Sequence, residues 1–126
     1  MKVLVVDDER DVQMLFEQKF RAERRTGEFE FYFAFSAEEA LLLLGKNGIS
    51  ELVLILSDIN MPGINGIQLL KIIKEKHPEI KVFMITAYGD DDNYQSAMQN
   101  GADGFLTKPL DFDDLKTRMK SLKKNE

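Results

Sequence analysis

The side chains best suited to chemistry in this 126-residue sequence are three aspartates, a threonine and a lysine that lie far apart along the chain. Each follows a short apolar run, and the set is Asp7, Asp8, Asp58, Thr86 and Lys108. Strand formation does not call for such residues, because aspartate is disfavoured in strands. Carboxylates brought close together repel by about 4 kcal/mol per pair at an effective dielectric near 20, so a cluster of three requires a cation.

Oxygen ligands of this kind favour magnesium, because Mg²⁺ keeps much of its hydration and prefers a site completed by phosphate oxygens. Asp58 is already ionised at neutral pH and can attack phosphorus without a general base. The metal and Lys108 would offset the charge on the transferring group, and the hydroxyl of Thr86 would donate a hydrogen bond to it. The residue types therefore predict a Mg²⁺-dependent site that forms an aspartyl phosphate on Asp58.

The elements that position these side chains follow from the apolar pattern. Short apolar runs predict strands over residues 3–6, 29–35, 52–56, 82–85 and 104–107. Apolar residues at helical spacing predict helices over residues 11–25, 37–44, 90–100 and 112–122, with one more between Gly63 and His77. Gly27 is a plausible stop for the first helix, and residues 36–39 have the spacing of a capping box for the second.

Alternating strands and helices, with strands that read as solid apolar runs, predict an α/β fold. We expect a doubly wound, five-stranded parallel sheet with helices on both faces, formed by one domain over residues 1–126. In such folds the functional site lies outside the carboxyl ends of the strands. The three aspartates, Thr86 and Lys108 are therefore expected at a common edge.

The amino-acid composition argues against several classes of function. A net charge of −5 and an isoelectric point near 5.0 argue against direct nucleic-acid binding, which favours a basic footprint. No apolar stretch approaches bilayer length, so we expect no membrane association. The sequence contains no cysteine, which excludes thiolate chemistry and fits a cytoplasmic location.

Four segments in a fixed order resemble a response-regulator receiver domain of two-component signalling, similar to the chemotaxis receiver. They are Val3–Asp8, Ser57–Gly63 with Gly66, Ile85–Ala87, and Gly101–Pro109. The resemblance spans nearly the whole chain and implies the flavodoxin-like strand order 2-1-3-4-5. It also implies a phosphorelay function, in which Asp58 receives a phosphoryl group from a sensor histidine kinase or a small phosphodonor.

Carried over residue by residue, the resemblance implies that Asp8 and Asp58 bind the metal directly and that Asp7 acts mostly through water. Asn60 would offer its backbone carbonyl to the metal. Thr86 and Lys108 would engage the phosphoryl group. The implied cofactor is Mg²⁺, and no position of this set is missing from the sequence.

The resemblance also implies a switch. Phe105 corresponds to an aromatic residue that moves inward as Thr86 moves toward the phosphate, and the Lys108-Pro109 bond would be cis. Phe105 lacks the phenolic hydroxyl found in part of the family, so a partner would recognise shape there. Asn65 stands where an acidic residue is common, which we expect to affect helix capping more than chemistry. The last two helices and the last strand would present the changed face to a partner or an output domain.

The same resemblance describes a regulatory phosphoacceptor domain rather than an enzyme acting on external substrates. Its partners would be a sensor histidine kinase and an output that the sequence does not name, and a phosphorylation-dependent homodimer is possible. Tyr88 and Asn60 flank the site and are candidates for tuning the lifetime of the acyl phosphate.

Two other classes share part of the pattern. An aspartyl-phosphate hydrolase would typically have an acid two residues after the nucleophile, where this sequence has Asn60. A flavodoxin-type cofactor binder would need a phosphate-cradling loop after the first strand, where Asp7, Asp8 and Glu9 would repel a phosphate. His77 is interpreted as a surface or capping residue, and the run 90–92 as acids at a helix N-terminus.

Overall fold

The structure, a computed structural model, describes residues 1–45, 48–87 and 91–124. Strands and helices alternate along the chain: β1 (Lys2–Val6), α1 (Asp11–Lys19), α2 (Arg21–Thr26), β2 (Glu30–Ala34), α3 (Ala37–Leu43), β3 (Leu52–Asp58), α4 (Gly66–Lys76), β4 (Lys81–Ala87), α5 (Asp91–Gln99), β5 (Gly104–Lys108) and α6 (Phe112–Lys124). The strands form a parallel five-stranded sheet in the order β2-β1-β3-β4-β5. The predicted fold class and strand order are therefore confirmed.

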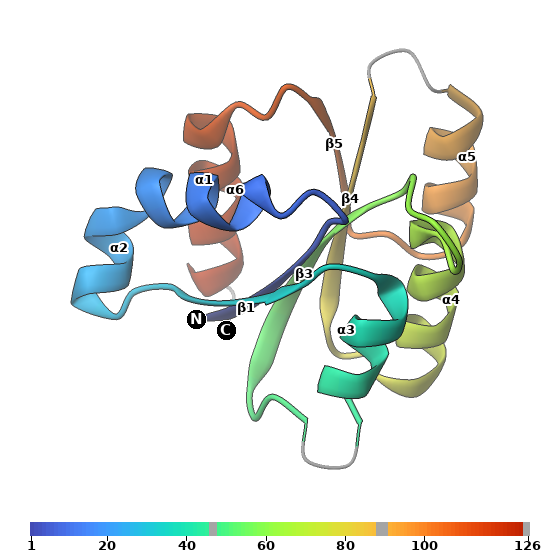
Figure 1. The fold of residues 1–126 in the computed structure, drawn as a ribbon, viewed down its shortest axis with the longest axis horizontal. Coiled ribbons are helices and arrows are strands. Elements are labelled where there is room, and N and C mark those ends of the chain that lie inside the picture. Colours follow the sequence, from blue (N-terminus) through green and yellow to red (C-terminus); the bar gives the residue numbers. More distant parts are fainter. Residues whose placement is uncertain (46–47, 88–90, 125–126) are drawn as a thin grey trace.

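The sheet separates two apolar layers (Figure 1). Helices α1, α2 and α6 cover one face, and α3, α4 and α5 cover the other. Alternate strand residues point to opposite faces, so Leu4 and Ile55 belong to the core under α3 and α4, whereas Val5 and Leu56 belong to the core under α1 and α6. This two-sided burial explains why the strands read as continuous apolar runs.

The prediction of a single helix over residues 11–25 is wrong, because the structure has two helices, α1 and α2, in this region. Phe20 separates α1 from α2 with φ −108° and ψ 25°, outside the helical region. Its ring is fully buried and lies 4.9 Å from the ring centroid of Phe31 and 5.8 Å from that of Phe29. We attribute the break to the packing of this ring against the sheet. Gly27 ends α2, as predicted, and adopts the left-handed conformation.

Three strands are longer than predicted at their carboxyl ends. Asp58, Thr86 and Lys108 were expected to follow the strands, but Asp58 and Lys108 are the last residues of β3 and β5, and Thr86 lies within β4. The ladder continues because Asp58 pairs with Ile85, and Lys108 pairs with Ala87. These three side chains are thus fixed by sheet hydrogen bonding, whereas Asp7 and Asp8 follow the end of β1.

Side-chain caps fix the starts of α3, which follows the edge strand β2, and of α4, which follows the central strand β3. The Ser36 hydroxyl accepts a hydrogen bond from the Glu39 amide at 3.0 Å. At α4 the capping box is complete, because Asn65 accepts from the Gln68 amide and Gln68 accepts from the Asn65 amide. The expectation that Asn65 acts in helix capping is confirmed. No helix in the described ranges combines the length and apolar character needed to cross a bilayer.

Gly66 allows α4 to begin directly against the end of β3. Its amide donates to the Ile59 carbonyl at 2.8 Å, and a Cβ at this position would meet the Asp58 carbonyl oxygen and the Cα of Ile59 inside van der Waals contact. Backbone atoms cannot yield as a flexible side chain can. The start of α4 therefore depends on glycine here.

We predict that Gly66→Ala lowers the free energy of unfolding by about 3 kcal/mol, at the upper end of what overpacking costs. Gly27→Ala is the matched control, because Gly27 has a φ of +79° and open space around the added Cβ, so only left-handed strain of about 1–2 kcal/mol is expected. Urea unfolding of both variants measures the difference. Equal losses for the two would contradict the close-approach argument.

Candidate functional site

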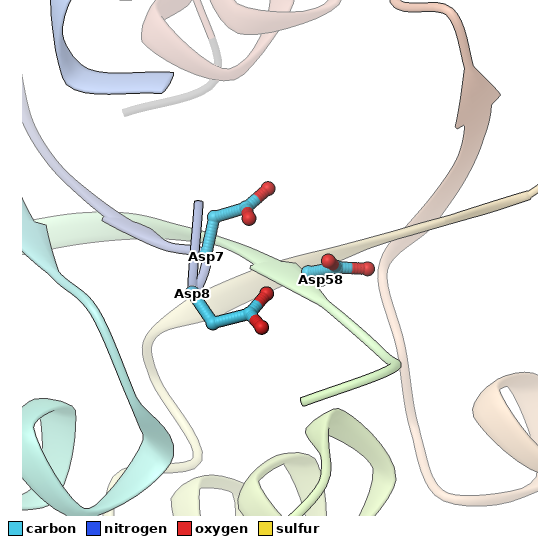
Figure 2. Close-up of side chains that lie close together, drawn as sticks. All are labelled: Asp7, Asp8 and Asp58. Carbon is cyan, nitrogen blue, oxygen red and sulfur yellow. The ribbon is translucent and has the colours of Figure 1, made fainter. Parts of the chain in front are cut away.

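Three aspartates converge at the carboxyl edge of the sheet. One carboxylate oxygen from each of Asp7, Asp8 and Asp58 lies within 4.8 Å of the others. Figure 2 shows the side chains reaching from the end of β1 and the end of β3 toward a common space. The register explains the meeting, because Val6 is paired with Ser57, which places Asp7 level with Asp58.

The three carboxylates differ in burial. Asp7 is 6% and Asp58 5% exposed, whereas Asp8 is exposed to solvent. The Glu9 amide donates to Asp7 Oδ1 at 2.9 Å and fixes the orientation of that carboxylate. The cluster therefore has an ordered inner side and an open side from which water and a phosphodonor can approach.

Lys108 supplies the positive charge that the folded chain itself places at the cluster. Its Nζ lies 3.2 Å from Asp58 Oδ2 and 3.5 Å from Asp7 Oδ2. This one ammonium group faces three clustered carboxylates, so the site retains an excess of negative charge. Such a group of oxygen ligands, partly buried and open on one side, fits a hydrated divalent cation.

The pKa values of the two central groups reflect this crowding. Burial raises the pKa of Asp58, and the charge of Asp7 raises it further, while Lys108 opposes both effects. For Lys108, burial lowers the pKa, but the charges of Asp58 and Asp7 more than offset this and raise it overall. Lys108 is thus held as a cation, and ionised Asp58 is at a disadvantage in the folded protein without further positive charge.

Thr86 lies within β4, beside β3 and β5, and is fully buried. Its Oγ1 has no hydrogen-bond partner among the described residues. A buried hydroxyl without a hydrogen-bond partner costs about 1–3 kcal/mol of stability. We therefore infer that Thr86 gains a partner when a ligand binds at the site. Oxygens of a phosphoryl group on Asp58 are acceptors of the kind it requires.

The remaining predicted residues lie around this centre. Asn60 is exposed two residues after Asp58 and donates its backbone N–H to that carboxylate. The ring of Phe105 packs edge-on against Tyr94 with centroids 5.0 Å apart. The Lys108-Pro109 bond is cis, as predicted. Tyr88 and the first acid of the 90–92 run lie outside the described residues.

His77 is not part of the site. It occupies the C-cap position of α4, and its Nδ1 lies 3.9 Å from Glu79 Oε1. This agrees with the interpretation as a surface or capping residue. Asp91 and Asp92 lie in the first turn of α5, as expected for acids at a helix N-terminus.

Two contacts at the same edge of the sheet were not predicted. The Arg10 guanidinium lies over the Phe35 ring, 4.4 Å from its centroid, and Glu38 accepts a hydrogen bond from the Ile64 amide. Both join residues that are distant in sequence. Neither contact is marked by a local sequence motif, so it can be recognised only in the folded structure.

Comparison with known proteins agrees with this geometry. Residues 3–120 match the model of the response regulator receiver domain. The chain belongs to the response regulator receiver domain family. Receiver domains are the regulatory phosphoacceptor domains of two-component signalling and bind Mg²⁺ in an acidic pocket, and response regulators interact with sensor histidine kinases.

Two curated relatives differ in how much of their own length this chain covers. The response regulator protein FleR of Pseudomonas aeruginosa is 38% identical over 110 residues, which cover 87% of this chain and 22% of FleR. Sporulation initiation phosphotransferase F of Bacillus subtilis is 32% identical over 119 residues, covering 94% of this chain and 90% of that protein. The chain thus spans under a quarter of FleR and nearly all of the Bacillus protein.

Solved structures share the fold. A receiver domain from Clostridium thermocellum superposes with a TM-score of 0.84 at 28% identity, covering 96% of this chain and 92% of that one. The response regulator TrrA of Thermotoga maritima, solved in complex with Mg²⁺-BeF, has a TM-score of 0.77 at 32% identity and covers 96% and 97% of the two chains.

We predict that Asp58→Asn raises the free energy of unfolding in EDTA by about 1–2 kcal/mol. Like charges about 5 Å apart repel by about 3 kcal/mol at an effective dielectric near 20, and Lys108 offsets part of this. The raised pKa of Asp58 gives the same sign, because folding disfavours the ionised form and neutralising it removes that cost near pH 7. Urea unfolding measures the change.

Added Mg²⁺ should stabilise the wild type more than Asp58→Asn, because the variant lacks one ligand charge. Asp11→Asn is the control, since Asp11 is an exposed aspartate at the start of α1 outside the cluster. A lower stability of Asp58→Asn in EDTA, or an equal gain from Mg²⁺ in all three proteins, would contradict the repulsion argument.

Proposed function

We propose that this chain is a phosphorylation-operated switch in which Asp58 is the phosphoacceptor. The observation that supports this most strongly is the convergence of three carboxylates, Lys108 and the unpartnered hydroxyl of Thr86 at one edge of the sheet. Asp7, Asp8, Asp58 and the backbone carbonyl of Asn60 would hold Mg²⁺. Bound there, the cation would supply the positive charge that three carboxylates and an incoming phosphoryl group require.

Phosphotransfer would begin with a carboxylate oxygen of Asp58 attacking phosphorus. The new O–P bond forms as the bond from phosphorus to the leaving group breaks, and the leaving group takes that electron pair. The leaving group is the imidazole nitrogen of a kinase phosphohistidine or the acyl oxygen of a small phosphodonor such as acetyl phosphate. The Nζ of Lys108, 3.2 Å from Asp58 Oδ2, would neutralise charge on the transferred oxygens.

The signal would leave the site through Thr86. Its hydroxyl would move to bond the phosphoryl group, and Phe105 would move into the space that opens, changing the face formed by α5, β5 and α6. Phe105 is partly buried and contacts Tyr94 of α5, so its movement alters contacts within that face. Shifting a population from almost wholly inactive to almost wholly active requires a preference of about 5 kcal/mol for one state.

The domain would comprise residues 1–126 and act as a regulatory phosphoacceptor in the cytoplasm, with a sensor histidine kinase as donor. Curated relatives named as DNA-binding transcriptional regulators are longer than this chain, which covers 13% to 22% of those proteins. The output of this chain would therefore be a partner or an attached domain, and a phosphorylation-dependent homodimer would be one way to reach it. Its own acidic charge disfavours direct contact with nucleic acid.

We predict that acetyl phosphate with Mg²⁺ adds the mass of one phosphoryl group to the wild type, and that peptide mapping places it on Asp58. Asp58→Asn should gain no mass, and Asp8→Asn should react at least about tenfold more slowly, because it loses a direct metal ligand. Asp11→Asn should react as the wild type does. Phosphorylation of Asp58→Asn, or equal rates with EDTA and with Mg²⁺, would refute the proposal.

Thr86→Val separates the switch from the chemistry. Valine has nearly the shape of threonine without the buried hydroxyl, so the unphosphorylated variant should be more stable by about 1 kcal/mol. Phosphorylation should still occur, but the changes in amide chemical shifts over α5 and β5 should be largely lost. A full set of phosphorylation-induced shifts in Thr86→Val would exclude this role for the hydroxyl.

A further inference from the structure

One side chain joins the first turn of α3 to the loop that leaves β3. Glu38 Oε1 accepts a hydrogen bond from the Ile64 backbone amide at 2.9 Å, across 26 positions of sequence. The loop begins directly after Asp58 and includes Asn60, whose carbonyl the proposed function assigns to the metal. Glu38 itself is not a member of the aspartate cluster.

Gly63 makes this approach possible. It has a φ of +74°, and a Cβ there would lie 2.9 Å from Glu38 Oε1 and 3.5 Å from Oε2. The carboxylate of Glu38 therefore occupies the space that a side chain at residue 63 would need. A glycine in the left-handed conformation serves both the turn and the close contact.

Both ends of the loop are fixed by backbone contacts. At the strand end, the Ile59 amide donates to the Ile85 carbonyl at 3.0 Å. At the helix end, the Gly66 amide donates to the Ile59 carbonyl, and the Asn65 capping box closes the first turn of α4. Within the described residues, the Asn60 amide bonds Asp58 at the end of β3, and the bond from the Ile64 amide to Glu38 is the hydrogen bond that ties the backbone of residues 61–64 to another element.

Helix α3 is itself anchored to the strand edge of the site. Its N-terminus is capped by Ser36, and Ala37 and Ala40 are fully buried. Just before it, the Ala34 carbonyl accepts the Asp7 amide at 3.1 Å. Glu38 thus connects the part of the frame that positions Asp7 with the loop that presents Asn60.

We propose that Glu38 is a positioning residue for the metal site: by holding the Ile64 amide, it keeps the 60–64 loop in the conformation that directs the Asn60 carbonyl toward Mg²⁺. The inference rests on the proposed function, in which that carbonyl is a ligand. Glu38 acts through the loop and does not touch the cation. Groups that orient metal ligands influence affinity without direct coordination.

The test is the Mg²⁺ affinity of ¹⁵N-labelled variants, measured by amide chemical shifts. Glu38→Ala removes the acceptor and should raise the Kd for Mg²⁺ about five- to tenfold, near the smaller end of what losing an orienting group costs. Glu38→Asp should weaken binding similarly, because it keeps the charge at the start of α3 but withdraws the carboxylate by one methylene. Glu38→Gln should bind nearly as the wild type does, because its amide oxygen still accepts.

Glu39→Ala is the matched control, since it removes the same charge from the next residue of the same helix turn. It should leave Mg²⁺ affinity unchanged. Faster solvent exchange of the Ile64 amide in Glu38→Ala and Glu38→Asp, but not in Glu38→Gln, would show that this hydrogen bond is the cause. Because Glu38→Asp retains an acid that favours a helix N-terminus, it keeps the test valid even where Glu38→Ala loses its native spectrum.

The outcomes separate the two proposals. A wild type that binds no Mg²⁺ would refute the metal site itself. A wild type that binds while Glu38→Asp and Glu38→Ala bind equally well would overturn the role of Glu38 and leave the phosphoacceptor proposal standing. An equal loss in Glu39→Ala, or a loss in Glu38→Gln as large as in Glu38→Ala, would assign the effect to charge and overturn positioning through the Ile64 amide.

Discussion

The mutual repulsion of Asp7, Asp8 and Asp58 is the constraint on which the structure of this domain depends. Three carboxylates held within 4.8 Å oppose folding, and one lysine compensates for only part of their charge. The sheet tolerates the cost because its two apolar cores fix the strand register on both faces. The same excess of negative charge suits the edge to a cation, and the proposed phosphoryl transfer would depend on that cation, so local instability and the proposed function would share one origin.

A second cost of the same kind lies at Thr86. Its buried hydroxyl lacks a partner in the described part of the chain, which a purely structural threonine would avoid. The contacts that hold the surrounding strands and helices in place are of ordinary kinds. They are close packing at Gly66, capping by Ser36 and Asn65, and parallel strand pairing up to Lys108. Both costs lie at the carboxyl edge of the sheet, where a ligand can offset them.

Much of this could be predicted from sequence, because the relevant signals are local. Solid apolar runs gave the parallel sheet, and polar residues ending those runs gave Asp7, Asp8, Asp58, Thr86 and Lys108. The break at Phe20 escaped prediction, since helical periodicity continues through it and only packing against Phe29 and Phe31 reveals it. The Glu38 contact with Ile64 escaped for a related reason, because its donor is a backbone amide 26 residues away and leaves no mark on residue types.

The most direct measurement is a crystal structure grown with Mn²⁺ and beryllofluoride, in which the anomalous signal of manganese locates the cation independently of any assumption about its ligands. We expect one strong peak bonded to Asp8, Asp58 and the Asn60 carbonyl, with beryllofluoride on Asp58 and the Thr86 hydroxyl turned toward it. A peak elsewhere, or beryllofluoride bound with no cation among the three aspartates, would contradict the proposed metal site.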